Sequence, residues 1–183
     1  MQLPSLPIIR LPRAAAALTM LAATAWLVPQ AAPALAAGEP TGTVLEQFYD
    51  WTLLADGPGK AVCFIASTPK PEAGAAARDG VVLYVSAWPK EGVKTELSAK
   101  LGGKPRKGGD ISITVGAASF KLFARDDRAF IDDPTRELKL IEAMKKGAKA
   151  VLRAEPEKGS PTVDSFSLSG FGQALQALAT QCP

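Results

Sequence analysis

Short runs in which apolar and polar positions alternate cover most of the chain beyond residue 45, and this period of two is typical of half-buried strands. The clearest run is residues 93–101, in which valine, threonine, leucine and alanine alternate with charged or hydroxyl side chains. Residues 37–45 show no such pattern and are expected to be a loose lead. Seven or eight strands are predicted, within residues 48–54, 61–68, 81–88, 93–101, 111–115, 119–124, 148–154 and 163–168.

A helical period interrupts the strands after residue 132. Asp133 suits the N-cap, a proline follows it at the first helical position, and Gly147 suits the stop. Between them Leu138, Ile141 and Met144 would form the apolar stripe. The sequence therefore predicts an internal helix that ends near residue 146.

A second helix is predicted at the end of the chain, from about residue 170. Its apolar residues recur at i, i+3, i+4, i+7, i+8 and i+11 and would share one face. These residues are Phe171, Ala174, Leu175, Leu178, Ala179 and Cys182.

The order of these elements indicates the fold class. Strands follow one another without an alternating strand–helix rhythm, which argues against a parallel α/β sheet. We expect a mainly β fold: an antiparallel β-sandwich or barrel-like sheet of about seven or eight strands. One internal helix and a C-terminal helix docked on the sheet would complete it.

The first 36 residues have the pattern of a secretory signal peptide. Arg10 and Arg13 give a basic start, residues 14–28 are apolar and uncharged, and residues 34–36 (ALA) suit cleavage. An uncleaved membrane anchor is the alternative. The uncharged run has 15 residues, fewer than the ~20 that span a bilayer, so cleavage is favoured.

Composition excludes several function classes. The 21 basic and 18 acidic residues give a net charge of +3, and cleavage would remove two arginines and leave +1, too little for a nucleic-acid binder. The chain has no histidine, which excludes Ser-His-Asp and Cys-His catalysis and the usual histidine-containing zinc sites. We expect no catalytic residue, no metal and no cofactor.

A serine–lysine or paired-carboxylate mechanism stays open as an alternative. Lys158 beside the serines of residues 160–169 could supply a base and a nucleophile. The period of two explains Ser165, Ser167 and Ser169 more simply, as the outward face of a strand.

The chain has two cysteines, and in an exported protein they are more often paired than free. Cys63 lies in a predicted strand and Cys182 on the apolar face of the last helix. No CxxC pair or histidine is present to activate a thiol. The sequence favours a structural Cys63–Cys182 disulfide over a reactive thiol.

Two charged clusters lie in predicted loops. Asp126, Asp127, Asp132 and Asp133 lack EF-hand spacing and are interpreted as turn residues and a helix cap rather than calcium ligands. Lys104, Arg106 and Lys107 could make a weak contact with an anionic lipid surface. A basic hairpin tip that keeps a sheet edge soluble is the alternative.

Five blocks of the chain share a recognisable pattern: residues 63–70 (CFIASTPK), 84–96 (YVSAWPKEGVKTE), 120–123 (FKLF), 140–147 (LIEAMKKG) and 164–182. The last is the most specific, since an aspartate and an aromatic precede Ser-Leu-x-Gly-Phe, Ala-Leu and Cys. In this order the blocks resemble the invasion-associated locus B family, small exported proteins of Gram-negative, mainly alphaproteobacterial, cells.

The chain departs from the family pattern at three places. Residues 158–162 (KGSPT) stand where the family often has Arg-Gly-Thr, Gly102-Gly103 where it has Gly-Tyr, and Ala129-Phe130 where it has Ala-Trp. If these positions form a recognition surface, the partner of this chain differs from that of its relatives.

The resemblance implies no catalytic residue that can be carried over. We expect a single domain over residues 37–183 that acts as a non-enzymatic binding protein for an envelope or host protein. It would lie in the periplasm after signal cleavage, or be exposed at the cell surface or secreted. The alternatives are a histidine-independent hydrolase of peptidoglycan or lipid and an envelope assembly or stress factor. The expected partner-binding residues are Lys158, Gly159, Ser160, Thr162 and Asp164.

Overall fold

The structure is a computed structural model that describes residues 41–71 and 78–182. All of these belong to one compact unit, residues 35–183. The predicted signal peptide lies outside the described residues, as does most of the loop predicted after residue 68. The fold below is that of the described residues alone.

Ten strands and two α-helices form within these residues. The helices are α1 (Pro134–Lys146) and α2 (Phe171–Gln181), and a short 3₁₀ helix, η1 (Pro89–Glu91), joins two strands. The strands are β1 (Thr43–Phe48), β2 (Trp51–Asp56), β3 (Val62–Ser67), β4 (Val81–Trp88), β5 (Val93–Leu101), β6 (Ile111–Val115), β7 (Ala118–Arg125), β8 (Arg128–Phe130), β9 (Lys149–Ala154) and β10 (Thr162–Ser167).

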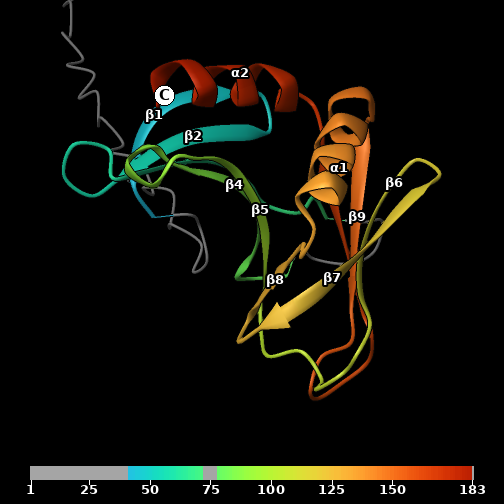
Figure 1. Ribbon diagram of the computed structural model, residues 1–183. Helices are drawn as coiled ribbons and strands as arrows, with labels where there is room; N and C mark the ends of the chain where they lie inside the picture. Colours follow the sequence, from blue (N-terminus) through green and yellow to red (C-terminus); the bar gives the residue numbers. More distant parts are fainter. Residues whose placement is uncertain (1–40, 72–77, 183) are drawn as a thin grey trace, which may run out of the picture. The chain divides into compact units, whose positions relative to one another are not determined.

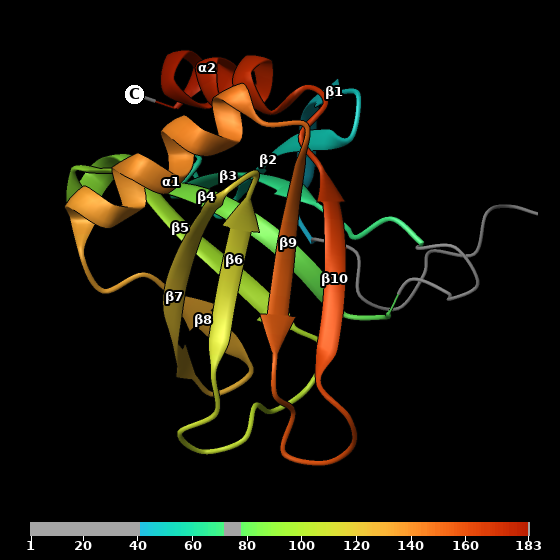
Figure 2. The same cartoon turned by 90° about the vertical axis from the view of Figure 1, so that its right-hand side faces the viewer.

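The strands make one antiparallel sheet in the order β1-β2-β3-β4-β5-β8-β7-β6-β9-β10. The sheet folds over on itself, so that β7, β6, β9 and β10 face β3, β4 and β5 across the core (Figures 1 and 2). Beyond β3 the amide of Lys70 donates to the carbonyl of Ser165 on β10, N–O 2.7 Å, which brings the two ends of the fold together. The predicted mainly β, barrel-like sandwich is confirmed, with more strands than expected.

Strands β1 and β8 were not predicted from the sequence, for different reasons. Residues 37–45 were expected to be a lead, but Thr43–Phe48 pair with β2 as an edge strand. Most of its side chains are exposed, so no apolar alternation marks it. Strand β8 has only three residues, and such a short run shows no period. It follows a turn in which Asp126 has a positive φ of 54°.

Helix α1 begins and ends where predicted. Asp133 Oδ1 accepts from the amides of Thr135 and Arg136, at 2.7 and 3.1 Å, and the helix stops before Gly147. The predicted apolar stripe is wrong at Leu138, which is 59 % exposed, while Leu140 is fully buried. At about 100° per residue, Leu138 lies about 120° round the helix from Met144 and leaves the buried face.

Helix α2 packs across β1, β2 and β3 at one end of the sheet (Figure 1). Trp51 and Phe171 are fully buried beneath it and meet edge to face, ring centroids 4.9 Å apart. The Trp51 Nε1–H donates to the carbonyl of Ser167 at 3.0 Å, which ties β2 to β10. The predicted face is correct except that Ala177 is buried and Ala179 exposed.

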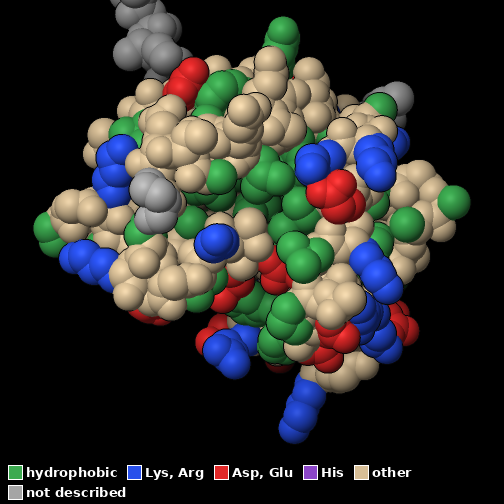
Figure 3. Space-filling view, turned by 45° about the horizontal axis from the view of Figure 1, so that its top comes forward, with side chains coloured by type: hydrophobic (Ala, Val, Ile, Leu, Met, Phe, Trp, Pro, Cys, Tyr) green, Lys and Arg blue, Asp and Glu red, His purple; other side chains and the backbone are tan. Residues whose placement is uncertain are grey.

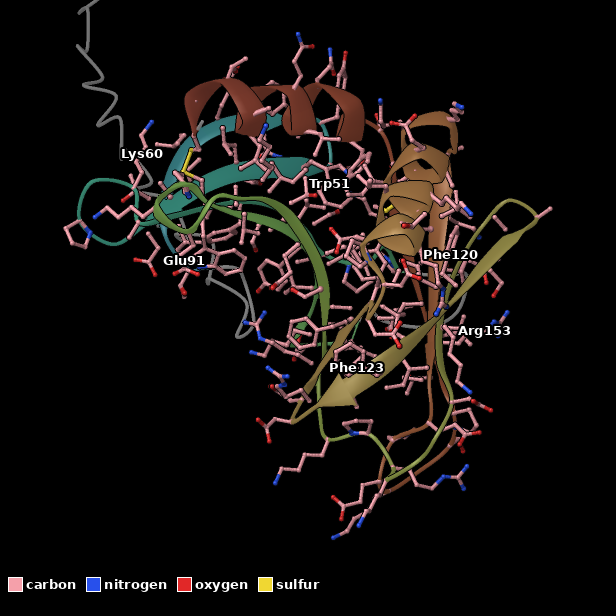
Figure 4. All side chains as sticks on the ribbon, in the orientation of Figure 1. Trp51, Lys60, Glu91, Phe120, Phe123 and Arg153 are labelled. Atoms are coloured by element: carbon pink, nitrogen blue, oxygen red, sulfur yellow. A yellow bond between two sulfur atoms is a disulfide. The ribbon has the colours of Figure 1, made fainter. Side chains whose placement is uncertain are left out.

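The predicted disulfide is present: Cys63 on β3 bonds Cys182, which follows α2, and their Cα atoms are 6.2 Å apart. Figure 4 shows it as a yellow bond beneath α2, close to Lys60. Lys60 Nζ donates to the carbonyl of Gln181 at 3.2 Å beside it. The last helix is thus held on the sheet by a covalent bond as well as by burial.

Gly170, which precedes α2, cannot be replaced without strain. Its φ is +88°, and an added Cβ would collide with the carbonyl oxygen of Phe48. Gly170→Ala is expected to lower the free energy of unfolding by about 3 kcal/mol, measured by urea denaturation. Gly172→Ala, inside α2 with no atom near its added Cβ, is the matched control and should gain about 0.5–1 kcal/mol. Equal effects of the two substitutions would contradict this account.

Glu137 on α1 makes part of the stability depend on pH. Burial raises the pKa of its carboxyl, more than the Leu97 amide and the Thr95 hydroxyl lower it. The folded state therefore binds the proton of the Glu137 carboxyl more tightly than the unfolded state does. The stability that this proton contributes is lost as the pH rises from 4.5 through the folded pKa. In urea unfolding from pH 4 to 7, the stability of Glu137→Gln should rise relative to wild type as the pH increases.

Glu142 on the same helix is the control with the opposite sign. Its bond with Lys145, at 2.7 Å, holds the pKa of its carboxyl below the usual range. Its contribution is present above pH 4.5 and lost as pH falls through the folded pKa. Glu142→Gln should therefore lose stability relative to wild type as the pH increases, and parallel pH profiles for the two variants would contradict both assignments.

Candidate functional site

Two loops meet at the end of the sheet opposite the helices, as Figure 2 shows. They are the β5–β6 loop, residues 102–110, and the β9–β10 loop, residues 155–161. The Arg106 amide donates to the Glu155 carbonyl at 2.7 Å, and the Glu157 amide donates to the Lys104 carbonyl at 2.9 Å. An ion pair between the Arg106 and Glu155 side chains adds to this short ladder. Backbone hydrogen bonds therefore fix the two loops relative to each other.

The loops enclose a pocket of about 450 Å³, called the loop pocket below. Its walls combine cationic, hydroxyl and small apolar side chains. They are formed by Arg78, Leu101, Gly102, Gly103, Lys104, Pro105, Ala154, Pro156, Glu157, Lys158, Ser160 and Thr162. Arg78 comes from the segment before β4, so three parts of the chain far apart in sequence build the pocket.

Arg78 is held rigidly in the pocket wall by a bidentate ion pair. Its Nε and Nη2 donate to the two carboxylate oxygens of Asp164, at 3.0 and 2.7 Å, and Nη2 also donates to the Leu101 carbonyl at 3.0 Å. The Asp164 side chain is 3 % exposed and that of Arg78 is 34 % exposed. Within residues 41–71 and 78–182 no acceptor bonds Nη1, so Arg78 keeps donors for another group.

The structure brings together most of the predicted partner-binding residues. Lys158, Ser160 and Thr162 line the loop pocket, and Gly159 lies between them at the tip with a φ of +94°. Asp164 is separated from them because it is buried on β10 as the partner of Arg78. A role for these five residues in partner binding stays a prediction, and Asp164 also positions Arg78.

The predicted basic cluster divides between different surroundings. Lys104 lines the loop pocket, Arg106 is paired with Glu155, and Lys107 is exposed outside the lining. No ion pair joins Lys104 or Lys158 to a carboxylate in the described part of the chain. Contact of this cluster with an anionic surface stays a prediction.

Two of the three departures from the family pattern meet in this pocket. Gly102-Gly103 and the segment 158–162 are about 55 residues apart, yet both line it. At position 103 a Cβ would meet no atom within 4 Å, so the absent side chain leaves open space rather than relieving a clash. Two of the three departures noted in the sequence therefore lie on one surface.

The serines considered for catalysis lie apart from the pocket, except Ser160. Ser165 is buried, contrary to the expected outward position, because the segment at Lys70 pairs with its backbone. Its hydroxyl has no hydrogen-bond partner among the described residues. Ser167 bonds the Ser169 amide at 3.2 Å, a local turn contact. Of these four serines, Ser160 is the one that lines the same pocket as Lys158.

The four loop aspartates are dispersed, and no group of three or more acidic or cysteine residues in the described ranges could hold a metal. Asp133 caps α1 and Asp132 pairs with Arg136 at 3.3 Å. None of the described helices is long and apolar enough to cross a bilayer.

An apolar groove lies between the two helices and β5, with a volume of about 530 Å³. Leu138, Ile141, Leu175 and Leu178 line it, and the ion pair of Glu142 with Lys145 stands beside it. Figure 3 shows apolar side chains gathered at the centre of this face, with charged side chains around them. The groove was not predicted from the sequence because the helical period assigned Leu138 to the core.

The described fold defines a mainly antiparallel β domain whose last helix is joined to the sheet by a disulfide. The chain belongs to the invasion associated locus B (IalB) protein family, whose profile matches residues 51–179.

Among solved structures, invasion associated protein b from Bartonella henselae shares this fold. The TM-score is 0.57 at 18 % sequence identity, and the match covers 76 % of this chain and 98 % of that one. No curated protein matches the chain. The comparisons therefore establish the family and the fold.

The residues that carry the family resemblance are structural. In the last block Asp164 pairs with Arg78, Gly170 allows α2 to approach β1, Phe171 packs on Trp51 and Cys182 forms the disulfide. These four residues of the last block therefore hold the scaffold together.

Proposed function

We propose that this chain is an exported, non-enzymatic binding protein that acts in the periplasm and contacts an envelope or host protein through the loop pocket. Family membership supports an invasion-associated role in the broad sense. The pattern of the first 36 residues supports export. The loops that line the pocket are the part of the described surface suited to this contact.

One observation carries the proposal: the segment 158–162 and Gly102-Gly103 converge on one pocket. Lys104 and Lys158 in its lining pair with no carboxylate among the described residues. The scaffold beneath is rigid, since hydrogen bonds join the loops and Asp164 holds Arg78. Binding residues placed on loops above a rigid sheet are a common arrangement in β domains.

The test is a cross-linking capture from periplasm with the captured proteins identified by mass spectrometry. The wild-type chain is expected to capture one dominant envelope protein. This capture should be lost when residues 158–162 are replaced by Gly and Ala. The matched control replaces the β2–β3 turn, residues 57–60, which lines no part of the pocket. Capture that is unchanged by the loop replacement, or lost equally in both variants, would overturn the proposal.

A further inference from the structure

We propose that the loop pocket binds a carboxylate group carried by an acidic segment of the protein partner. This rests on the proposed function and adds to it the chemistry of the group recognised. The pocket's charge, its fixed donor and its apolar lining are three separate arguments for it.

The charge in the pocket favours an anion. Lys104 and Lys158 come from opposite loops, line the same cavity and have no ion-pair partner among the described residues. Arg78 and buried Asp164 neutralise each other, and Glu157 is the one acidic residue of the lining. The pocket therefore has an uncompensated positive charge that a single oxyanion would balance.

The hydrogen-bond donors favour recognition of that anion at a fixed place. Arg78 cannot swing, because three hydrogen bonds hold Nε and Nη2, and its Nη1 donors carry no bond to the described residues. The Ser160 hydroxyl adds a donor that can rotate toward an acceptor. Donors positioned before binding lose little freedom when the ligand arrives.

The surroundings favour an acidic peptide over an anionic membrane. Attraction to a lipid surface grows with the number of basic residues that face it. At this end Arg106 is paired with Glu155, Lys121 is paired with Asp110 at 2.9 Å, and Glu157 is also present, so the net positive charge is small. The pocket lining includes Leu101, Pro105, Ala154 and Pro156, which suit the apolar parts of a peptide.

The experiment titrates the disulfide-intact protein with tetraglutamate, capped at both ends, and follows backbone amide NMR signals. Shifts are expected at Gly102, Gly103 and Ser160, and capped tetraglutamine should cause none. The double variant Lys104→Gln, Lys158→Gln should weaken tetraglutamate binding about tenfold. The control Lys90→Gln, Lys139→Gln removes the same charge from η1 and α1, outside the lining, and should change affinity less than about twofold.

Two further probes separate the sources of an anion. Inorganic phosphate and vesicles of phosphatidylglycerol with phosphatidylethanolamine are titrated in the same way. The carboxylate assignment would be overturned if phosphate or vesicles bound the pocket more strongly than tetraglutamate, or if tetraglutamine bound as well as tetraglutamate. Equal loss of tetraglutamate affinity in the two double variants would also overturn it. If the variant with Lys104 and Lys158 replaced still captures the periplasmic partner, this inference fails while the proposed function stands.

Discussion

Replacing Cys63 and Cys182 together by alanine is expected to lower the free energy of unfolding by about 5 kcal/mol. The bond joins residues 119 positions apart, so in the unfolded chain it closes a loop that contains most of the domain. Removing it raises the conformational entropy of the unfolded state and so favours unfolding. Both cysteines are buried, at 0 and 5 % exposure, and alanine avoids leaving an unpaired hydroxyl there. The measurement is the urea midpoint of the two proteins, each followed by tryptophan fluorescence.

The matched control for this expectation is reduction. Dithiothreitol should shift the midpoint of the wild-type protein toward that of the alanine variant and leave the variant unchanged. A loss below about 1 kcal/mol in the alanine variant would contradict a stabilising role for the disulfide.

Arg78→Met is expected to lower the free energy of unfolding by about 3 kcal/mol, the second large effect. The substitution leaves the Asp164 carboxylate buried on β10 without a cation, and unpaired buried charge is costly. Denaturant unfolding at pH 7 measures the loss.

The double variant Arg78→Met, Asp164→Leu tests the physical reason. It removes both charges and keeps apolar volume, so it should recover most of the stability lost in the single variant. A double variant no more stable than Arg78→Met would show that packing, and not the pairing of charges, holds this part of the wall.

The elements that the sequence revealed are those whose pattern is visible along the chain itself. Strands β5 and β6 were predicted closely because apolar and polar residues alternate in their sequences, and β4 because its apolar run is unbroken. The limits of α1 were predicted because Asp133 marks the cap. The disulfide was predicted because the chain has two cysteines, which leave one pairing, and its first 36 residues led us to expect export. Strands β1 and β8 were missed because edge pairing and shortness leave no period to detect.

The candidate site was less predictable because it depends on contacts between distant segments. The loop 158–162 was identified from its departure from the family pattern, but Arg78 stood in a stretch that carried no signal. The pairing of Asp164 with Arg78 was not predictable from the sequence because the two residues are 86 positions apart. Only the sheet order, which places β5, β9 and β10 around one end, brings these side chains together.

The central claim is that the loop pocket, and not the apolar groove, contacts the partner. The most direct measurement places a photo-reactive amino acid in one site at a time and compares cross-linking in living cells. Position 160 lies in the pocket, and position 138, at a leucine that is 59 % exposed, lies in the groove. We predict a discrete cross-linked species from position 160 and none from position 138. A discrete species from position 138 with none from position 160 would contradict the claim.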